Sequence, residues 1–342
     1  SDRSSIIFTA RAEEESIFPI FVCIGIKAAA KSEFEDMSKI QVKKLHTLTG
    51  HNDCIYALRE GADPRYFYTG AGDGMVVEWD LDHPKDGTLL ARLPHSVYAI
   101  EVDPKRNTLI VGHNYEGIHV IDLVEKKESW SLKLGSSAIF DLKVFGDELF
   151  VATGDGVLFV VDLEVRAIKR HIKLSNKSIR VLAIAPSKKQ LALGFSDHSI
   201  QVLDLTKDAA PIARLERHTN SVFALGYSPD EEVLVSGARD ACLKFWNTNT
   251  FLLEENVVAH LYAINYLSFR EDGQYLVTCS MDKSLKIWDM SSRNLVKVID
   301  KARNAGHGTS INKVFWSTYS GVIVSVSDDR TIAIWQIEAQ TL

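Results

Sequence analysis

Apolar and polar residues alternate in short runs along most of the chain. The clearest run covers residues 233–247, with the sequence VLVSGARDACLKFWN. Apolar residues alternate with polar ones up to a turn at Arg239-Asp240, and again from this turn to Trp246. A period of two is typical of a strand with one buried face, so this stretch predicts a β-hairpin.

The same hairpin recurs at residues 69–80, 278–289 and 325–336. In each copy a Ser or Thr stands four residues before an Asp, and a Trp stands six residues after that Asp. Recurrence of one pattern along a chain indicates a repeat protein, in which each copy belongs to one structural unit.

The repeats have a nearly constant length. Taking Trp79 as the first anchor, the equivalent positions lie 40 to 47 residues apart, at Ile121, Val161, Leu203, Trp246, Trp288 and Trp335. Each unit has room for several short strands, separated by bends such as Asp63-Pro64 and Asp272-Gly273. A period of about 40 to 45 residues with several short strands is typical of propeller blades and not of helical repeats.

Six of the seven anchors are followed by Asp or Asn, as in Trp79-Asp80 and Trp246-Asn247, whereas Trp335 precedes Gln336. With this dipeptide at this period, residues 42–337 resemble the WD40-repeat family. The resemblance implies an all-β fold, a seven-bladed WD40 β-propeller.

A ring of blades must also close, because an open ring leaves unpaired strand edges. Residues 41–48 precede the first inner strand and fit the position beside the C-terminal strand. We therefore expect this N-terminal strand to pair in the blade of the C-terminal strands. Residues 41–342 form the predicted propeller domain, and residues 1–40 an N-terminal extension or leader. The segment before Met37 is a candidate non-native leader.

His218, Ser236 and Asp240 could suggest a nucleophilic triad, but the same set occurs in four repeats. In the WD40 family such residues form, together with the Trp, a buried hydrogen-bonded tetrad within a blade. The resemblance assigns this structural role to His51, Thr69, Asp73, Trp79, His218, Ser236, Asp240, Trp246, His260, Thr278, Asp282, Trp288, His307, Ser325, Asp329 and Trp335. We therefore expect no catalytic residues and no enzyme activity.

The second, third and fourth repeats depart from this pattern. They have Val111, Val151 and Leu193 in place of the Ser or Thr, and no Trp at the anchor position. Only the turn residues Asp155 and Asp197 remain. We expect these three blades to depend on apolar packing.

Composition and charge indicate a folded soluble protein and disfavour a nucleic-acid partner. Hydrophobic residues make up 46% and charged residues 25%, as in ordinary folded soluble proteins. The net charge is −6 and the paired lysines do not cluster. Because nucleic-acid binding depends on grouped Lys and Arg, we expect no nucleic-acid partner.

The cysteines indicate a reducing compartment. Cys23, Cys54, Cys242 and Cys279 are far apart and form no CxxC pair, so we expect buried free thiols, no metal site and no cofactor. The most apolar run, residues 17–26, is too short to span a bilayer. These features predict a cytoplasmic protein with no membrane partner.

Partner-binding residues are expected around the top mouth of the channel. In each unit the second residue of the inner strand should point toward this mouth, and so should the residue before the turn Asp. In WD40 proteins this rim commonly binds the partner. The resulting candidates are Tyr56, Tyr98, Phe140, Arg180, Phe223, Asn265, Asn312, Arg239, Met281 and Asp328.

Four aromatic and two arginine side chains on one rim favour a protein or peptide partner, because Tyr and Arg are enriched at interface hot spots. The sequence therefore predicts a non-catalytic scaffold that uses the top face. One alternative is that some aromatic rings merely fill the channel. Another is a reader of a phosphorylated or otherwise anionic ligand through Arg180 and Arg239. The sequence identifies neither the partner nor the oligomeric state.

Overall fold

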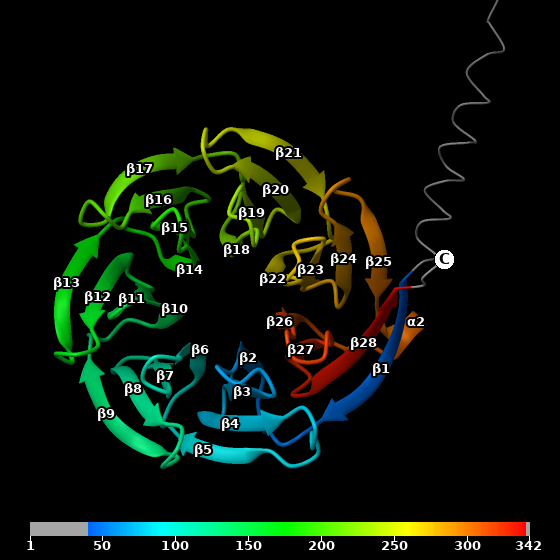
Figure 1. Ribbon diagram of the computed structural model, residues 1–342, viewed down its shortest axis with the longest axis horizontal. Coiled ribbons are helices and arrows are strands. Elements are labelled where there is room, and N and C mark those ends of the chain that lie inside the picture. Colours follow the sequence, from blue (N-terminus) through cyan, green and yellow to red (C-terminus); the bar gives the residue numbers. More distant parts are fainter. Residues whose placement is uncertain (1–39, 340–342) are drawn as a thin grey trace, which may run out of the picture. The chain divides into compact units, whose positions relative to one another are not determined.

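Seven four-stranded antiparallel sheets surround a central channel in the computed structural model, which describes residues 40–339 (Figure 1). Each sheet is one blade of a propeller. This arrangement confirms the predicted all-β, seven-bladed fold. The prediction of a leader before Met37 concerns residues outside the described range. Within that range, no helix is long and apolar enough to cross a membrane.

The blades follow one another along the chain, and in blades 1 to 6 the first strand lies nearest the channel (Figure 1). In blade 7 the strand nearest the channel is β26, and β1 is the outermost. Blade 1 contains β2 (Ile55–Glu60), β3 (Tyr66–Ala71), β4 (Met75–Asp80) and β5 (Thr88–Arg92). Blade 2 contains β6 (Val97–Asp103), β7 (Thr108–His113), β8 (Gly117–Asp122) and β9 (Lys127–Lys133). Blade 3 contains β10 (Ile139–Phe145), β11 (Glu148–Thr153), β12 (Val157–Asp162) and β13 (Ala167–Lys173). Blade 4 contains β14 (Ile179–Ala185), β15 (Gln190–Phe195), β16 (Ile200–Asp204) and β17 (Ala210–Leu215). Blade 5 contains β18 (Val222–Tyr227), β19 (Val233–Ala238), β20 (Cys242–Asn247) and β21 (Leu253–Val258). Blade 6 contains β22 (Ile264–Phe269), β23 (Tyr275–Ser280), β24 (Leu285–Asp289) and β25 (Leu295–Ile299). Blade 7 contains β26 (Ile311–Trp316), β27 (Ile323–Ser327), β28 (Ile332–Ala339) and β1 (Ile40–Leu48).

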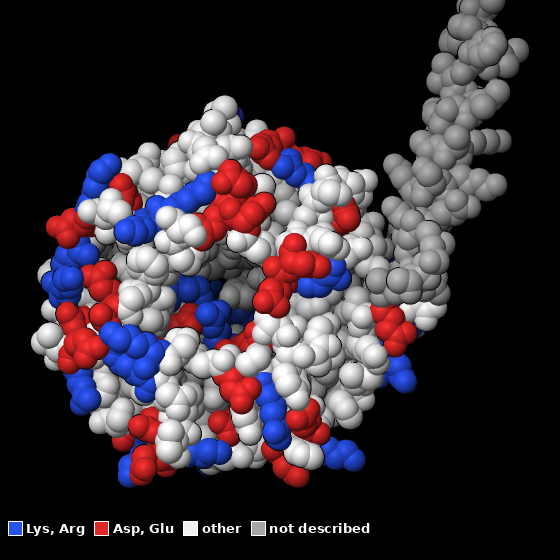
Figure 2. Space-filling model, in the orientation of Figure 1, with Lys and Arg blue, Asp and Glu red and all other residues white. Residues whose placement is uncertain are grey.

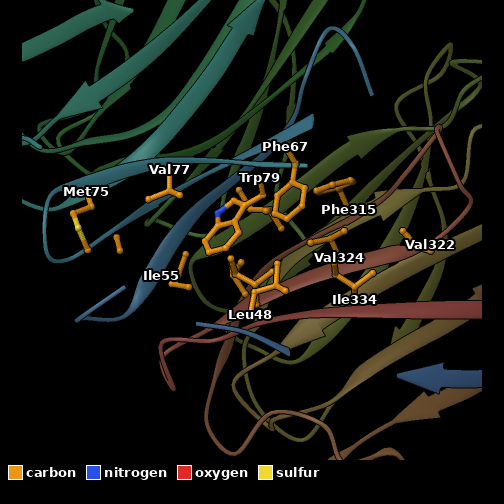
Figure 3. Packing of buried hydrophobic residues seen from close by; sticks show 14 residues of the cluster. Leu48, Ile55, Phe67, Met75, Val77, Trp79, Phe315, Val322, Val324 and Ile334 are labelled. Carbon is orange, nitrogen blue, oxygen red and sulfur yellow. The ribbon is translucent and has the colours of Figure 1, made fainter. Parts of the chain in front are cut away.

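The hydrophobic core lies between neighbouring blades. The second strand of a blade is buried along nearly its whole length, as in β7, whereas the outer strand β21 alternates between half-buried and exposed positions. Between blades 7 and 1, Phe67 and Trp79 pack in one cluster with Phe315 and Val324 (Figure 3). Each blade therefore depends on its neighbours to bury its apolar faces.

The ring closes as predicted. β1 pairs antiparallel with β28, from Ile40 opposite Ala339 to Leu48 opposite Ile332 (Figure 1). A bulge between Lys44 and His46 interrupts the pairing. The two ends of the propeller thus share one sheet.

A short helix distinguishes the last repeat. Helix α2 (Lys301–Asn304) follows β25, and the side chain of Asp300 caps it by accepting a hydrogen bond from the backbone N–H of Arg303. This insertion lies between the anchors Trp288 and Trp335 and accounts for the greater length of that repeat.

Three cysteines lie in the described range, and all three carry free thiols. Cys279 is buried, and burial raises the pKa of its thiol. Cys54 and Cys242 are only half-buried, so the prediction of buried thiols is correct for Cys279 alone. Cys23 lies outside the described residues.

Candidate functional site

The four predicted tetrads assemble within blades 1, 5, 6 and 7. In blade 6, Trp288 Nε1–H donates to Thr278 Oγ1 at 3.0 Å, and Thr278 Oγ1 lies 2.8 Å from His260 Nε2. His260 Nδ1 lies 2.8 Å from Asp282 Oδ2. The same order of contacts joins the corresponding residues of the other three blades. Each tetrad joins the loop before the inner strand, which contains the His, to the second and third strands of the blade.

The direction of the hydrogen bonds defines the protonation state of each tetrad. The Trp N–H must donate, so the hydroxyl oxygen accepts from it, and the hydroxyl O–H is free to donate a hydrogen bond to Nε2 of a neutral His. The His then carries its proton on Nδ1 and donates to the Asp. In blade 5, burial opposes ionisation of Asp240, but hydrogen bonds from His218 and from the backbone N–H groups of Thr219 and Cys242 lower its pKa to about 2. The tetrads therefore require neutral His and ionised Asp.

This requirement predicts loss of stability in acid. Burial lowers the pKa of His51, His218 and His260 below the model-peptide value of 6.5. The pKa of Asp240 is also lowered, from 3.8 to about 2. Both kinds of shift stabilise the fold at higher pH, since the unfolded chain binds protons that the tetrads exclude. We expect the free energy of unfolding to be constant above about pH 7, to fall below about pH 6.5 and to fall further below about pH 4. Urea unfolding between about pH 8 and pH 2.5 measures both falls, and stability that rises as the pH is lowered from 7 to 5 would contradict the prediction.

Blades 2 to 4 pack through buried apolar clusters, as predicted, and they also contain polar contacts that were not predicted. In blade 2, His113 is fully buried and its Nε2 accepts the backbone N–H of His95 at 3.1 Å. In blade 3, Thr153 Oγ1 donates to Asp155 at 2.6 Å. In blade 4, the hydroxyl of Ser199 donates to Asp197. The sequence did not indicate these contacts because His113, Thr153 and Ser199 occupy positions other than those of the tetrad.

His113, Glu116 and His119 are close enough in space to raise the question of a metal site, with one potential ligand atom each within 4.8 Å of the others. However, the hydrogen bond from the His95 N–H occupies the lone pair of His113 Nε2. The ring proton is then on Nδ1, which faces Glu116 at 3.4 Å. A metal would need a lone pair where this proton lies, so the tautomer disfavours metal binding.

A β-bulge begins every inner strand. The pairing of inner and second strands skips one residue in each blade, and the bulge turns that residue out of the regular ladder. The skipped residues are Tyr56, Tyr98, Phe140, Arg180, Phe223, Asn265 and Asn312. They are the seven inner-strand candidates from the sequence.

These seven residues share one cavity of about 500 Å³ at the mouth of the channel. Met281 and Asp328 also line it, whereas Arg239 is exposed and does not. Nine of the ten predicted rim residues thus lie around one cavity. The sequence missed Ser310 and Lys313, which complete the lining.

One side of the mouth is aromatic. The rings of Tyr56 and Tyr98 lie 4.9 Å apart, and those of Tyr98 and Phe140 lie 6.1 Å apart. The guanidinium of Arg180 follows, 3.9 Å from the ring centroid of Phe140 and 5.1 Å from that of Phe223. The result is an arc of neighbouring π surfaces across blades 1 to 5, in which the aromatic rings are tilted against one another.

The other side is polar and internally hydrogen-bonded. Asn265 Nδ2 donates to Ser310 Oγ at 3.0 Å and to the carbonyl of Ile311 at 2.8 Å. Asn312 Nδ2 donates to Asp328 Oδ1 at 2.7 Å and to the carbonyl of Ile55 at 2.9 Å. These contacts hold the rim of blades 6, 7 and 1 in one arrangement.

Exposed apolar side chains adjoin this rim. Leu261 and Tyr262 are 83% and 63% exposed, and Met281 beside them lines the cavity. A sequence signal for them exists: Leu261 and Tyr262 follow the tetrad His260, where the other tetrad repeats have Asn-Asp, Thr-Asn and Gly-Thr. Comparing this inter-strand loop between repeats would have identified the pair.

Comparison with known proteins agrees with this architecture. The family described as "WD domain, G-beta repeat" matches residues 42–80, 209–247, 253–289 and 299–336. The four matches contain the four tetrad hairpins, and the region between the first two contains blades 2 and 3 and the first three strands of blade 4, which lack a tetrad.

Proteins with similar sequences are longer than the region that aligns with this chain. Protein tipD of Dictyostelium discoideum is 22% identical over 89% of this chain and 50% of its own length. The chromatin assembly factor 1 subunit FAS2 homolog of Oryza sativa subsp. japonica is 26% identical over 47% of this chain and 34% of its own length. Transducin-like enhancer protein 2 of Mus musculus is 24% identical over 72% of this chain and 33% of its own length. The chain therefore spans at most about half the length of these relatives. The four repeat matches and the closed ring of seven blades together show that the chain belongs to the WD40-repeat family.

Proposed function

We propose that this protein is a non-catalytic scaffold that binds a peptide segment of a protein partner at the mouth of its channel. The observation that carries the proposal is the single cavity of about 500 Å³ lined by all seven bulge residues. Cavities of roughly 300 to 1,000 Å³ suit ligands the size of a few side chains. Bulges hold the lining residues on rigid strands, which lowers the entropy lost on binding.

The exposure of the aromatic rings favours binding over channel filling. Tyr56, Tyr98, Phe140 and Phe223 are all half-buried and line an open cavity. Rings that only filled the channel would bury their faces against one another and leave no such space. The neighbouring Leu261 and Tyr262 extend the apolar surface outward from the mouth.

The tetrads support a non-catalytic role. Ser236 and Ser325 are fully buried, and each hydroxyl oxygen already accepts a Trp N–H while it contacts a His. A nucleophile must be accessible to its substrate, and these hydroxyls are not.

Two further features concern the assembly in which the protein acts and its cellular compartment. One relative is named as a subunit of chromatin assembly factor 1, which is a role within a multiprotein assembly. The three free thiols in the described part of the chain support the proposal of a reducing compartment such as the cytoplasm.

The proposal predicts that Tyr98→Ala combined with Phe140→Ala removes partner binding. Each ring is a candidate hot spot, and loss of one such contact costs about 2 kcal/mol or more, which corresponds to roughly 30-fold in affinity. Affinity capture from native lysate, quantified against the wild type, measures the effect. Tyr319→Ala, on an exposed ring outside the mouth cavity, is the control. Unchanged recovery of the same partners by a double variant with unchanged melting temperature would refute the proposal.

The alternative function is a reader of an anionic ligand through Arg180 and Arg239, and the cavity supports it for Arg180 only. Arg180 lines the cavity, whereas Arg239 is exposed outside its lining. The two arginines therefore do not share this cavity as one anion site.

A further inference from the structure

Arg180 is a cation without a counter-ion. It lies in the bulge at the start of β14, and aromatic rings cover its guanidinium. Within residues 40–339 it forms no ion pair and donates no side-chain hydrogen bond to a protein acceptor. Burial lowers its pKa, and no carboxylate opposes this effect. A partly desolvated charge without a partner costs free energy, which an anionic ligand would recover.

Two other cations on inner strands, Arg59 and Lys143, are neutralised by a carboxylate. Arg59 and Lys143, on inner strands β2 and β10, contact the two carboxylate oxygens of Glu101 at 2.8 and 3.2 Å. Figure 2, which looks down the channel, shows basic side chains on its wall. These two cations share a carboxylate partner, whereas Arg180 at the mouth has none among residues 40–339.

A second cation lines the same cavity. Lys313 lies on β26, directly after the bulge residue Asn312, and its Nζ lies 3.8 Å from the ring centroid of Tyr266. It too has no carboxylate within ion-pair distance in the described part of the chain. The cavity lining therefore contains two cations, Arg180 and Lys313, and one carboxylate, Asp328, which gives a local charge of +1. The whole chain has a net charge of −6, so this local sign is opposite to that of the protein.

We propose that the mouth cavity recognises an anionic group of the bound peptide, a carboxylate or a phosphate, through the guanidinium of Arg180. The inference rests on the proposed function. The donor N–H groups of a guanidinium lie in its plane, so rings over its faces leave these donors free for an anion. Lys313 adds positive potential from across the channel and attracts the same group.

The test uses fluorescent nonapeptide libraries with identical degenerate flanks and a central Ser, phosphoserine, Gln or Glu. Binding to the full chain is measured by anisotropy. We expect the wild type to bind the phosphoserine library more tightly than the Ser library, the Glu library more tightly than the Gln library, or both. The expected preference is roughly tenfold or more, as for a charge-assisted hydrogen bond. A preference in the phosphoserine pair alone assigns a phosphate, and one in the Glu pair assigns a carboxylate.

Variants locate the anion. Arg180→Gln should reduce the preference to near one, Arg180→Lys should retain part of it, and Lys313→Gln should weaken it. Arg239→Gln changes the charge equally at an exposed site outside the cavity and should leave the preference unchanged. Melting temperatures identify any variant that loses its fold.

Several results would overturn the inference. Equal binding of charged and neutral libraries would remove anion recognition while leaving the peptide-binding proposal intact. Equal losses in Arg239→Gln and Arg180→Gln would show a general charge effect. Failure of the wild type to bind any library would overturn anion recognition at this mouth. If partner capture by Tyr98→Ala with Phe140→Ala were also unchanged, the proposed function would fail with it.

Discussion

Deletion of residues 40–48 is expected to abolish the single cooperative unfolding transition of the propeller. This segment is strand β1, which supplies the outer strand of blade 7. Leu48 packs in the cluster between blades 7 and 1, and Ile40 packs in the cluster that contains Trp335. Without β1, the edge of β28 is open and part of two apolar clusters is exposed.

The loss of cooperative unfolding should affect all seven blades. Each blade is stabilised only by its neighbours, and blade 7 connects the end of the ring to its start. Circular dichroism during urea unfolding measures the transition, and light scattering detects association through the open edge of β28. A matched control is Leu45→Ser, at the bulge in β1 where the side chain is 37% exposed. This change should alter stability by no more than about 0.5 kcal/mol. A deleted protein that unfolds cooperatively at the midpoint of the full chain would contradict the closure mechanism.

Thr278→Val is expected to reduce the free energy of unfolding by about 2 to 6 kcal/mol. The side chain is fully buried, and its hydroxyl both accepts from Trp288 and contacts His260 Nε2. Valine has a similar shape but neither donates nor accepts. It would leave the Trp N–H and the His nitrogen buried without partners, at a cost of about 1 to 3 kcal/mol each.

Blade 2 shows why the cost depends on the partners and not on valine itself. Val111 occupies the position of Thr278, and Ile121 occupies that of Trp288. Blade 2 therefore has no Trp N–H that needs a hydroxyl acceptor. The control Thr88→Val makes the same chemical change at an exposed residue of β5. Urea unfolding at neutral pH compares the two variants, and a loss below about 0.5 kcal/mol in Thr278→Val would show that the tetrad is not stabilising.

Most of the fold was predictable because it depends on local patterns. The alternation of residues 233–247 and its copies indicates hairpins, and their period indicates blades. The four tetrads were recognisable because all their members stand at constant offsets in four repeats. The polar contact in blade 2 was not predicted, since the hydrogen bond between the backbone N–H of His95 and His113 follows no repeated offset.

The candidate site was predictable in its membership but not in its electrostatics. Counting four residues from each tetrad His finds the start of an inner strand, and the next residue is the rim candidate. Lys313 was missed because strict alternation places neighbours on opposite sides, whereas the bulge between Ile311 and Lys313 breaks that alternation. Arg239 was included because its sequence offset equals that of Met281 and Asp328, although it does not line the cavity.

The sequence by itself determined the repeat, the number of blades, the closing strand and nine of the residues that line the channel mouth. Each of these follows from spacing along the chain, which a ring of equivalent units converts directly into position. Only the tertiary structure decided that Arg180 lies between two aromatic rings without a counter-ion, while Arg59 is paired with Glu101. The physical reason is that pairing of charges depends on distances between different blades, and residues far apart in the sequence set those distances only once the ring has closed.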